Sequence, residues 1–491
     1  MNNMKNSIYC LLLLLLVSNL GFAQQKKSTK PNIIFILADD LSARELSIYG
    51  NQEHKTPNLD MLAKEGIYFS TCWGAAVCSP ARAMLLTGKY AYQTQWYSVR
   101  LTPKGDEPNA CLYKQHTLLS MIAKQAGYTT AMSGKWQMGC GDPTKDWKWD
   151  EWSLPYKYLP WHGDVCPDSF ILTGQVPMYW GGPFGANGVA KKTTNQDFAE
   201  DLHNDFMLDF ISRHKNEPFF YYYTTNLPHV SWDYEHRNPN DIDKKTGKYN
   251  WNYVEMPKRD SNGAQGYNAD GSKQKTAGTL TTNIAYLDYQ IGKLIEKLKA
   301  LHIYENTLII FTADNATTGW KGSVEEEHGP RVPLIIKGPG IIKSPKPQSA
   351  LVDFTDFVPT LAQIMNMELP KKEQMDGKSF YPLLYGKPFE SREWIYTNHD
   401  QYRMFRSSQW ILDGYKTLWF SGENRNHIGY KKLPYQANDS TRDAMTYFNK
   451  VSKQIPDLDT TTQFFKKSKS YYEDYKKVKE VENKTMPLDK P

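Results

Sequence analysis

Few features of this 491-residue sequence point to a membrane, to nucleic acid or to zinc. After residue 23 no apolar run approaches the roughly 20 residues that a membrane-spanning helix needs. The net charge of +6 comes without a dense basic block, which argues against nucleic acid as a partner. The six cysteines are not spaced as zinc ligands. What remains is a globular chain long enough for a large core, and we expect two domains of unequal size.

The first segment, residues 1–23, has the pattern of a signal peptide. Lys5 precedes the apolar run 11–17, and Gly21 and Ala23 provide small residues for the cleavage site. The apolar run is too short to span a bilayer. We therefore expect an exported protein without a membrane span, periplasmic or secreted after cleavage near Ala23.

The cysteine count of the remaining chain is odd. After the signal peptide the sequence contains Cys72, Cys78, Cys111, Cys140 and Cys166. An odd number suggests that one cysteine has a special role. Export permits disulfides among the other four, but the sequence does not assign their pairing.

Strands alternate with helices along most of the chain. Patterns of apolar residues predict helices over 56–66, 117–125, 198–211 and 284–301, and strands over 32–37, 128–132, 218–225 and 307–312. Thr56 is expected to be the N-cap of the first of these helices, with Pro57 in its first turn. This alternation predicts an α/β fold, in which helices sandwich a large, mainly parallel sheet.

The pattern changes after about residue 388. Short, aromatic, β-rich segments follow at 392–397, 403–407, 410–412 and 415–420. They predict a smaller C-terminal α+β domain, residues 389–491, built on an antiparallel sheet. The larger domain would then comprise residues 24–388.

Acidic and amide side chains directly follow two of the expected strands. Asp39 and Asp40 come after the strand at 32–37, and Asp314 and Asn315 come after the strand at 307–312. Ligands bind at the carboxyl edge of open α/β sheets. Single acids at strand ends often cap loops, but two pairs of hard oxygen ligands favour a shared site for calcium rather than zinc.

A five-residue motif, C-S-P-A-R at 78–82, is followed by L-T-G at 86–88. The motif matches the C-x-P-x-R signature of type I, formylglycine-dependent sulfatases in the alkaline-phosphatase-like superfamily. Further matching segments occur in the family's order: A-D-D at 38–40, T-P-N-L-D at 56–60, G-K-W at 134–136, P-H at 228–229, F-T-A-D-N at 311–315, K-G-S at 321–323 and R-V-P at 331–333. The resemblance is strong over residues 31–385 and weak beyond them.

The resemblance implies that Cys78 is the catalytic residue. In the family, a formylglycine-generating or sulfatase-maturating enzyme oxidises this cysteine to Cα-formylglycine (3-oxoalanine), and a hydroxyl of its hydrate attacks sulfur. The second hydroxyl then allows sulfate to leave by C–O cleavage, a form of covalent catalysis. A buried structural thiol is the ordinary interpretation of a cysteine, but Pro80 and Arg82 at the motif's spacing argue against it. Pro80 also predicts a helix start, which places Cys78 at a positive helix end.

The resemblance also implies a ligand set for one Ca²⁺ per chain and a set of catalytic cations. The implied metal ligands are Asp39, Asp40, the modified Cys78, Asp314 and Asn315. The implied sulfate-binding cations, which stabilise transition-state charge, are Arg82, Lys135 and Lys321. His229 matches the histidine that protonates or binds the leaving oxygen, a role suited to imidazole near neutral pH.

The sequence departs from the family pattern at two places. The family usually has histidine two residues after the lysine of G-K-W, where this chain has Gln137, which can form hydrogen bonds but cannot take a proton. His162 or His328 is a candidate substitute for the missing base. The second departure is E-E-E-H-G-P at 325–330, where the family more often has a glutamate and paired glycines.

Substrate identity is only broadly indicated. Five tryptophans, of which Trp161 is one, follow Lys135 in an irregular stretch, and they either stack on sugar rings or belong to the core. We expect Gln137, Trp161 and His162 to contact substrate. Export, the mild positive charge and these aromatics favour a sulfated polysaccharide or oligosaccharide, such as ulvan, carrageenan, fucoidan or a glycosaminoglycan. The chain resembles bacterial exported polysaccharide sulfatases.

Two other functions fit parts of the pattern. One is a phosphomonoester or phosphonate-ester hydrolase of the same fold, since fold does not decide the ester cleaved. The other is a non-catalytic glycan-binding homologue, which the intact motif around Cys78 disfavours.

Overall fold

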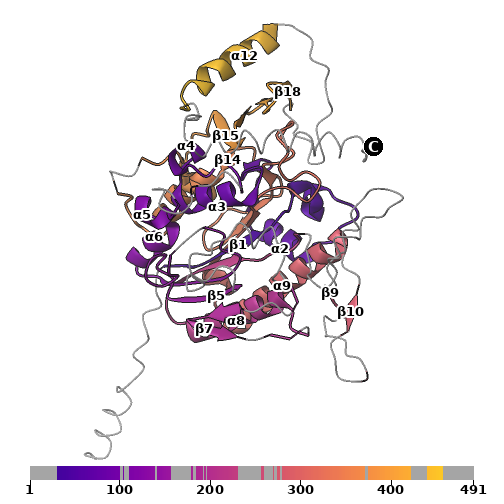
Figure 1. Cartoon of the computed structure of the whole chain (residues 1–491), viewed down its shortest axis with the longest axis vertical. Coiled ribbons are helices and arrows are strands. Elements are labelled where there is room, and N and C mark those ends of the chain that lie inside the picture. The colour runs from indigo at the N-terminus through magenta and orange to yellow at the C-terminus, as the bar shows by residue number, and fades with distance from the viewer. Residues whose placement is uncertain are drawn as a thin grey trace, which may run out of the picture.

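A computed structural model describes residues 30–456, apart from 100–102, 104–109, 139–140, 156–178, 181–183, 192, 195, 230–255, 259–268, 270–273, 277–278, 371–373 and 422–438. Among these residues, a nine-stranded sheet forms the centre of the molecule (Figure 1). Its strands lie in the order β2 (Ile67–Tyr68), β13 (Leu334–Lys337), β11 (Thr307–Ala313), β1 (Asn32–Ala38), β8 (Phe219–Thr224), β4 (Thr129–Gly134), β5 (Glu151–Pro155), β6 (Phe184–Ala186) and β7 (Val189–Lys191). The predicted signal peptide lies outside the described residues.

The centre of the sheet is parallel and its two edges are antiparallel. Strands β11, β1, β8, β4 and β5 run parallel to one another. Strands β13 and β2 continue the sheet antiparallel on one side, and β6 and β7 do so on the other. The turn between β6 and β7 is Asn187-Gly188, and both residues have positive φ, as a two-residue hairpin turn requires. The predicted α/β class is confirmed, but the sheet is mixed, with antiparallel strands on either side of its parallel centre.

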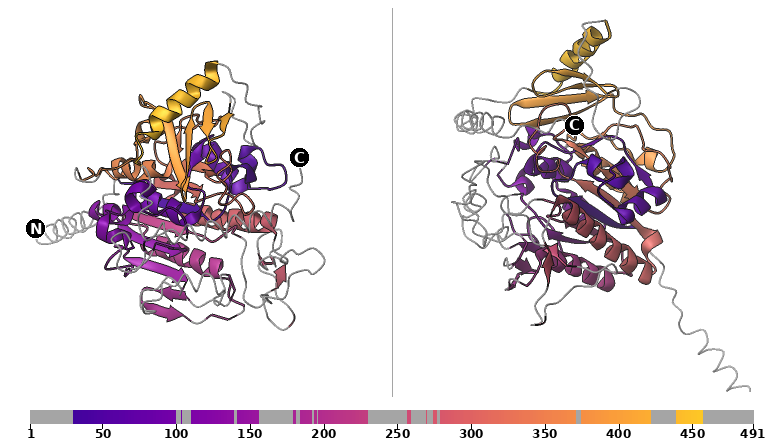
Figure 2. Two further views of the ribbon diagram at one scale, coloured as in Figure 1. Left: turned by 45° about the horizontal axis from the view of Figure 1, so that its top comes forward. Right: turned by 90° about the vertical axis from the view of Figure 1, so that its right-hand side faces the viewer.

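Helices cover both faces of this sheet (Figures 1 and 2). On one face lie α2 (Pro57–Glu65), α8 (Ala199–Arg213) and α9 (Leu280–Ala300), and on the other lie α3 (Cys78–Thr87), α6 (Leu119–Gln125) and α10 (Phe357–Ile364). The buried stripe of α9 includes Ile284, Leu287 and Ile291, as its periodicity predicts. No helix within the described ranges combines the length and apolarity that crossing a membrane takes.

The start of α2 differs in detail from the prediction. Thr56 occupies the N-cap position, but its side chain bonds to Ser47 and Asp60 instead of to the helix amides. The carboxylate of Asp288, on the neighbouring helix α9, accepts the backbone N–H groups of Asn58 and Leu59 at 3.1 and 2.9 Å. The predicted N-cap position of Thr56 and the place of Pro57 are confirmed, but a tertiary neighbour supplies the acceptor for the helix amides.

The C-terminal segments form a separate four-stranded antiparallel sheet, which confirms the predicted smaller unit (Figure 2). Its strands are β15 (Trp394–His399), β16 (Tyr402–Ser407), β17 (Trp410–Leu412) and β18 (Leu418–Phe420), and α12 (Asp439–Ser452) packs against them. The last strand begins three residues later than expected, since 413–417 form a turn. The exact division of the chain at 388–389 stays a prediction.

A small sheet joins this unit to the main body. It consists of β3 (Cys72–Trp73), β12 (Arg331–Val332) and β14 (Val352–Asp353). Trp73 packs in one apolar cluster with residues of the C-terminal sheet, such as Ile395 and Met404. Beside this cluster, the Glu327 carboxylate accepts hydrogen bonds from Trp73 Nε1 at 2.9 Å and Arg406 Nη1 at 2.5 Å. The junction is therefore both apolar and ion-paired.

Candidate active site

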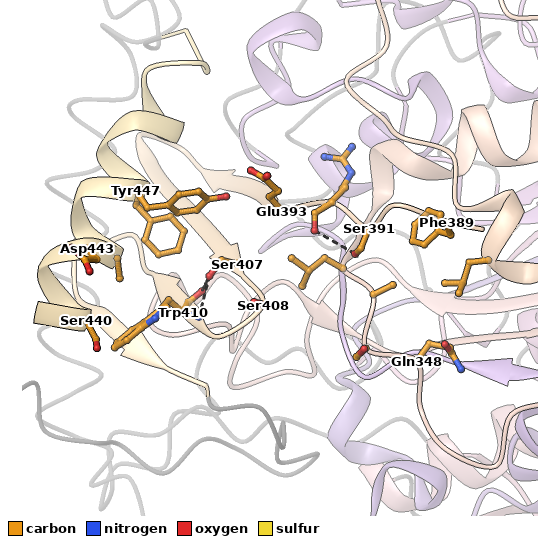
Figure 3. Close-up of a pocket in the computed structure, with 17 residues that line it drawn as sticks. Gln348, Phe389, Ser391, Glu393, Ser407, Ser408, Trp410, Ser440, Asp443 and Tyr447 are labelled. Atoms are coloured by element: carbon orange, nitrogen blue, oxygen red, sulfur yellow. Dashed lines mark hydrogen bonds between the residues drawn. The ribbon is translucent and has the colours of Figure 1, made fainter. Parts of the chain in front are cut away.

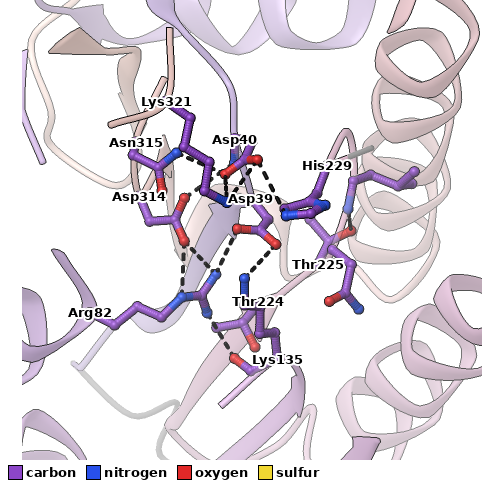
Figure 4. A network of polar contacts seen from close by, with 12 residues as sticks. Asp39, Asp40, Arg82, Lys135, Thr224, Thr225, His229, Asp314, Asn315 and Lys321 are labelled. Carbon is purple, nitrogen blue, oxygen red and sulfur yellow. Dashed lines mark hydrogen bonds and ion pairs between the residues drawn. The ribbon is translucent and has the colours of Figure 1, made fainter. Parts of the chain in front are cut away.

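The two predicted strand-end pairs meet at the carboxyl edge of the central sheet (Figure 4). Strands β1 and β11 are parallel neighbours with Ala38 opposite Ala313, so Asp39 and Asp40 emerge beside Asp314. The side chains of Asp39, Asp40 and Asp314 are essentially inaccessible to solvent. A group of buried carboxylates is costly unless cations or hydrogen-bond donors compensate their charge.

Backbone contacts fix the geometry of this strand-end cluster. Asp314 N donates to Ala38 O at 3.1 Å, and Asp40 N donates to Asp314 Oδ1 at 3.2 Å. The Asn315 amide donates to Asp40 Oδ1 at 2.8 Å. Asp40 has a φ of 61°, a left-handed conformation that acidic residues adopt more readily than most others. The carboxylates are thus pre-positioned by the sheet.

Cys78 is the first residue of α3, as the Pro80 signal predicted, and the residue is 2% exposed. Ligand atoms of Asp39, Cys78 and Asp314 all lie within 4.8 Å of one another. The loop before Cys78 lies tightly against the cluster, because a Cβ on Gly74 would meet Asp314 O at 2.2 Å. The helix N-terminus adds positive potential at the cysteine.

Arg82 and Lys135 are the buried cations of the cluster. Arg82, one turn after Cys78, donates to Asp314 Oδ2 through Nε at 3.0 Å and Nη2 at 2.7 Å. Lys135 Nζ donates to Asp39 Oδ2 at 2.7 Å. Arg82 Nη1 also donates to the backbone carbonyl of Lys135 at 2.8 Å, which links the two cations.

Lys321 and His229 contact Asp40, a third carboxylate of the cluster. Lys321 Nζ is 2.8 Å from Asp40 Oδ1, and His229 Nε2 is 3.4 Å from Asp40 Oδ2. Both side chains are partly exposed, at 25% and 16%, whereas the Arg82 side chain is fully buried. Lys321 and His229 therefore lie on the accessible side of the cluster, where a substrate can reach them.

Charge and burial shift the pKa values of these groups in opposite directions. Burial alone would raise the pKa of Asp39, but Lys135 and the other cations outweigh it and keep this pKa below its ordinary value. Burial and the charge of Asp39 raise the pKa of Asp314 to about 7. Burial lowers the pKa of His229, an effect that Asp40 opposes. A further positive charge between Asp39 and Asp314 would favour the ionised form of both carboxylates.

Two buried oxygen atoms test whether the cluster fits a divalent cation. Asp39 Oδ1 and Asn315 Oδ1 accept no hydrogen bond from any residue that the structure describes. Arg82 Nη2 lies 3.7 Å from Asp39 Oδ1, which is beyond hydrogen-bond distance. Buried polar atoms normally have partners. Unsatisfied oxygens within a set of carboxylate and amide ligands are what a calcium ion requires.

The other predicted substrate residues are only partly placed. Trp161 and His162 lie outside the described residues. Gln137 has a φ of 59° and follows Lys135 in the same loop, and its Oε1 is buried. The His328 ring packs at a tilt against Trp320, and its Nε2 lies 3.2 Å from Glu326. These contacts tie His328 to the segment 320–328 and not to the cluster.

The described tryptophans of the irregular stretch belong to the core. Trp147, Trp149, Trp152 and Trp180 are at most 5% exposed. Trp149, for example, stacks on Tyr222 with ring centroids 5.9 Å apart. Of the two interpretations that the sequence left open, burial in the core therefore holds for these four residues.

The sequence analysis missed the residues that support His229. Thr225 and Asn226 lie between β8 and His229, and Glu200 on α8 bonds to both of them. The polar run after β8 is the same strand-end signal that identified Asp39, whereas nothing in the sequence marks Glu200. His399 from the C-terminal sheet was also missed, and its Nδ1 lies 2.9 Å from the carbonyl of Gly322.

A cavity of about 780 Å³ lies elsewhere, beside the C-terminal sheet and α12 (Figure 3). Its wall includes Trp410, Tyr447 and Phe389, with several serines. It contains none of the residues of the strand-end cluster. Nothing in its lining provides the cations or the cysteine of the candidate site.

Two family models match the chain. The model described as Sulfatase matches residues 31–367, well over half of the chain, and that described as N-sulphoglucosamine sulphohydrolase, C-terminal, matches residues 322–419. The Sulfatase match, together with this fold, defines a sulfuric ester hydrolase of the alkaline-phosphatase-like superfamily. The chain belongs to the sulfatase family.

Individual relatives agree with this family. An N-acetylglucosamine-6-O-sulfatase of Bacteroides thetaiotaomicron is 28% identical over 447 residues, which cover 76% of this chain and 74% of the relative. An ulvan-active sulfatase of Formosa agariphila is 28% identical over 372 residues, which cover 75% of this chain and 60% of the relative. A protein solved in complex with its substrate D-glucosamine-2-N,6-O-disulfate has a TM-score of 0.64 and 23% identity, over 87% of this chain and 98% of that one. This structural likeness shows the fold alone.

Proposed function

We propose that this sulfatase hydrolyses sulfate esters on a sulfated polysaccharide or oligosaccharide, with a formylglycine made from Cys78 and one bound calcium. The observation that carries the proposal is the position of Cys78, at a helix N-terminus and within 4.8 Å of the Asp39 and Asp314 ligand atoms. The relatives named for N-acetylglucosamine-6-O-sulfate and for ulvan support a sulfated glycan as substrate.

Asp39, Asp40, Asp314 and Asn315 would hold the calcium, together with the modified Cys78. When bound, calcium would offset the negative charge of these carboxylates and polarise a sulfate oxygen. The formylglycine hydrate would supply the nucleophilic hydroxyl. The unsatisfied oxygens of Asp39 and Asn315 support this ligand set.

The remaining groups would bind the sulfate group and donate a proton to the leaving sugar oxygen. Lys135 and the other cations keep the pKa of Asp39 below its ordinary value, and Arg82 opposes the rise in the pKa of Asp314. Both Arg82 and Lys135 would place positive charge beside the attacked sulfur, where negative charge grows in the transition state. Lys321, on the accessible side, can contact a sulfate oxygen. His229 can donate a proton or a hydrogen bond to the leaving sugar oxygen, which is a poor leaving group without it.

We also propose that the chain is exported with loss of residues 1–23 and that a formylglycine-generating or sulfatase-maturating enzyme oxidises Cys78. The pattern of Lys5 and the apolar run 11–17 supports export. N-terminal sequencing of the protein secreted by a bacterial host would find a start near residue 24. An intact Met1 would contradict this part of the proposal.

The decisive experiment is sulfate release with matched cysteine variants. The chain is expressed with a formylglycine-generating enzyme and calcium, and sulfate is measured over a panel of sulfated oligosaccharides. We expect release from at least one of them and a loss of at least about 1,000-fold in Cys78→Ala, since the nucleophile is absent. Cys72→Ala is the control, because Cys72 is also a free, buried thiol.

Mass spectrometry of the Cys78 peptide accompanies the assay. If the aldehyde is present but no sulfate is released from any sugar, the proposed substrate class is wrong. Release of phosphate from matched phosphate esters, in place of sulfate, would favour a phosphoester hydrolase. Equal activity of Cys78→Ala and the parent protein would contradict the proposed nucleophile.

A further inference from the structure

Glu200 is a fully buried carboxylate on α8 that the proposed mechanism does not use. No cation in the described part of the chain pairs with it. Instead it accepts a hydrogen bond from Thr225 Oγ1 at 2.6 Å and another from Asn226 Nδ2 at 2.6 Å. A buried carboxylate without a cation is costly, so its position calls for a reason beyond packing.

Thr225 and Asn226 connect Glu200 to His229 (Figure 4 shows Thr225 and His229). Thr225 Oγ1, which donates to Glu200, also accepts from Leu227 N at 3.0 Å. The carbonyl of Asn226 accepts from His229 N at 2.8 Å. One carboxylate therefore holds both side chains at the start of the turn that ends in the histidine.

The same turn is attached to the ligand cluster. Asp39 N donates to the carbonyl of Leu227 at 3.1 Å. Tyr179 also holds the turn, since its hydroxyl lies 2.8 Å from the carbonyl oxygens of both Asn226 and His229. Tyr179 thus fixes the carbonyls of the turn, whereas Glu200 fixes its side chains. Without Glu200 the side chains of Thr225 and Asn226 would lose their shared acceptor.

We propose that Glu200 is a positioning residue for His229: by holding Thr225 and Asn226 it fixes the turn that directs the imidazole at the leaving oxygen of the substrate. The proposal rests on the proposed function, in which His229 assists departure of the sugar oxygen. Catalytic groups need positions accurate to a fraction of an ångström, so a shifted turn costs rate even when the histidine is intact.

Leaving-group dependence separates this role from a structural one. A sugar alkoxide leaves poorly and needs a proton, whereas the nitrophenolate of 4-nitrophenyl sulfate leaves without one. Damage confined to the position of His229 therefore slows sugar desulfation much more than aryl sulfate hydrolysis. General loss of folded enzyme slows both reactions equally.

The experiment measures kcat and KM on both substrates for the formylglycine-containing enzyme. We expect Glu200→Ala to lower kcat on the sugar sulfate about 10- to 100-fold, which is less than the roughly 100- to 10,000-fold that a general acid contributes because His229 itself is kept, and on 4-nitrophenyl sulfate less than about threefold. Glu200→Gln should recover much of the activity. Its amide oxygen can still accept from Thr225, and its NH₂ can donate to Asn226 once the Asn226 amide rotates by about 180°. Thr225→Val removes the hydroxyl that donates to Glu200, so its kinetic effect should resemble that of Glu200→Ala. This second variant keeps the test valid if Glu200→Ala does not fold.

A double variant tests whether the two residues act together. In the His229→Ala background, Glu200→Ala should add less than about a twofold further loss on the sugar, since residues that act through one group are not additive. His203→Gln is the matched control, because His203 lies on the same helix, is equally buried and contacts Ser153 on β5. His203→Gln should change kcat on both substrates by the same factor.

Three outcomes overturn the proposal. Equal losses on both substrates in Glu200→Ala and Thr225→Val would assign Glu200 to stability alone. Full additivity with His229→Ala would show that the two residues act independently. If His229→Ala itself shows no leaving-group dependence while the parent enzyme is active, the role given to His229 fails and that of Glu200 fails with it. An inactive parent enzyme would instead count against the proposed function.

Discussion

Arg82 and Lys135 show how single side chains set the charge of a buried site. Each is bound to a carboxylate at 2.7 Å, and Arg82 is completely inaccessible. Burial lowers the pKa of Arg82, but Asp314, Asp39 and other neighbouring groups together raise it by more, so the guanidinium stays charged. Both cations are bound to carboxylates that we propose as calcium ligands, Asp314 and Asp39. Replacing either cation would therefore change both the sulfate site and the metal site.

Glu200 gives a prediction at the residue scale that does not depend on activity. Burial raises its pKa to about 7 in the folded protein, from 4.5 in the unfolded chain. The folded state therefore keeps a proton that the unfolded state loses, so stability falls as pH rises from about 4.5 to about 7. From pH 5 to pH 8 we expect the free energy of unfolding of the parent protein to fall by about 2 to 3 kcal/mol relative to that of Glu200→Gln, whose side chain does not titrate.

Urea unfolding of both proteins at several pH values between 5 and 8 measures this difference. All other titrating groups are common to the two proteins and cancel in the comparison. A difference in stability that does not change with pH would show that Glu200 stays ionised throughout this range.

At the scale of elements, α2 depends on an acceptor from a distant part of the chain. Asp288 of α9 receives the Asn58 and Leu59 amides and also the Asn58 side chain, at 2.9 Å. We expect Asp288→Ala to lower the free energy of unfolding by about 1 to 3 kcal/mol, because it leaves the buried Leu59 amide and the part-buried donors of Asn58 without their acceptor. Thermal or urea unfolding monitored by circular dichroism measures the loss.

Glu296→Ala is the control for that variant. Glu296 lies on the same helix but is exposed to solvent, so its replacement should change stability by less than about 0.5 kcal/mol. Equal effects of the two substitutions would show that Asp288 acts through the propensity of α9 and not as a cap for α2.

At the scale of the whole molecule, the site joins segments that are far apart in sequence. Asp39 follows β1, Cys78 starts α3, Lys135 follows β4, His229 follows β8 and Asp314 follows β11. Three neighbouring parallel strands, β11, β1 and β8, bring most of these ends to one edge of the sheet. A ligand bound here would hold the N-terminal and later parts of the main sheet together.

Calcium should therefore stabilise the entire fold. We expect calcium at 100 times its dissociation constant to add about 2.7 kcal/mol to the free energy of unfolding, and removal by a chelator to lower the melting temperature by a few degrees. Asp314→Asn should abolish most of this response. Calorimetry with and without calcium measures it.

Asp356→Asn is the control for the calcium response. Asp356 is another buried carboxylate, but it is bound to Arg392 and lies outside the cluster. This variant should respond to calcium as the parent does. An unchanged response in Asp314→Asn would contradict the ligand set.

The sequence by itself determined the alternating pattern of strands and helices, the strand-end carboxylates and the motif around Cys78. These are local signals, since an apolar run, a helix start and a strand end each depend on adjacent residues. The sequence also placed the site at the carboxyl edge, because parallel strands share that edge.

Only the tertiary structure decided which residues support the site and which sheet edges are antiparallel. Glu200 meets Thr225 and Asn226, and Asp288 accepts the first amides of α2, through contacts between segments that no local pattern connects. The tryptophans around Trp149 turned out to be core because burial depends on what packs above the sheet. Such pairings arise from packing, and packing is a property of the whole chain.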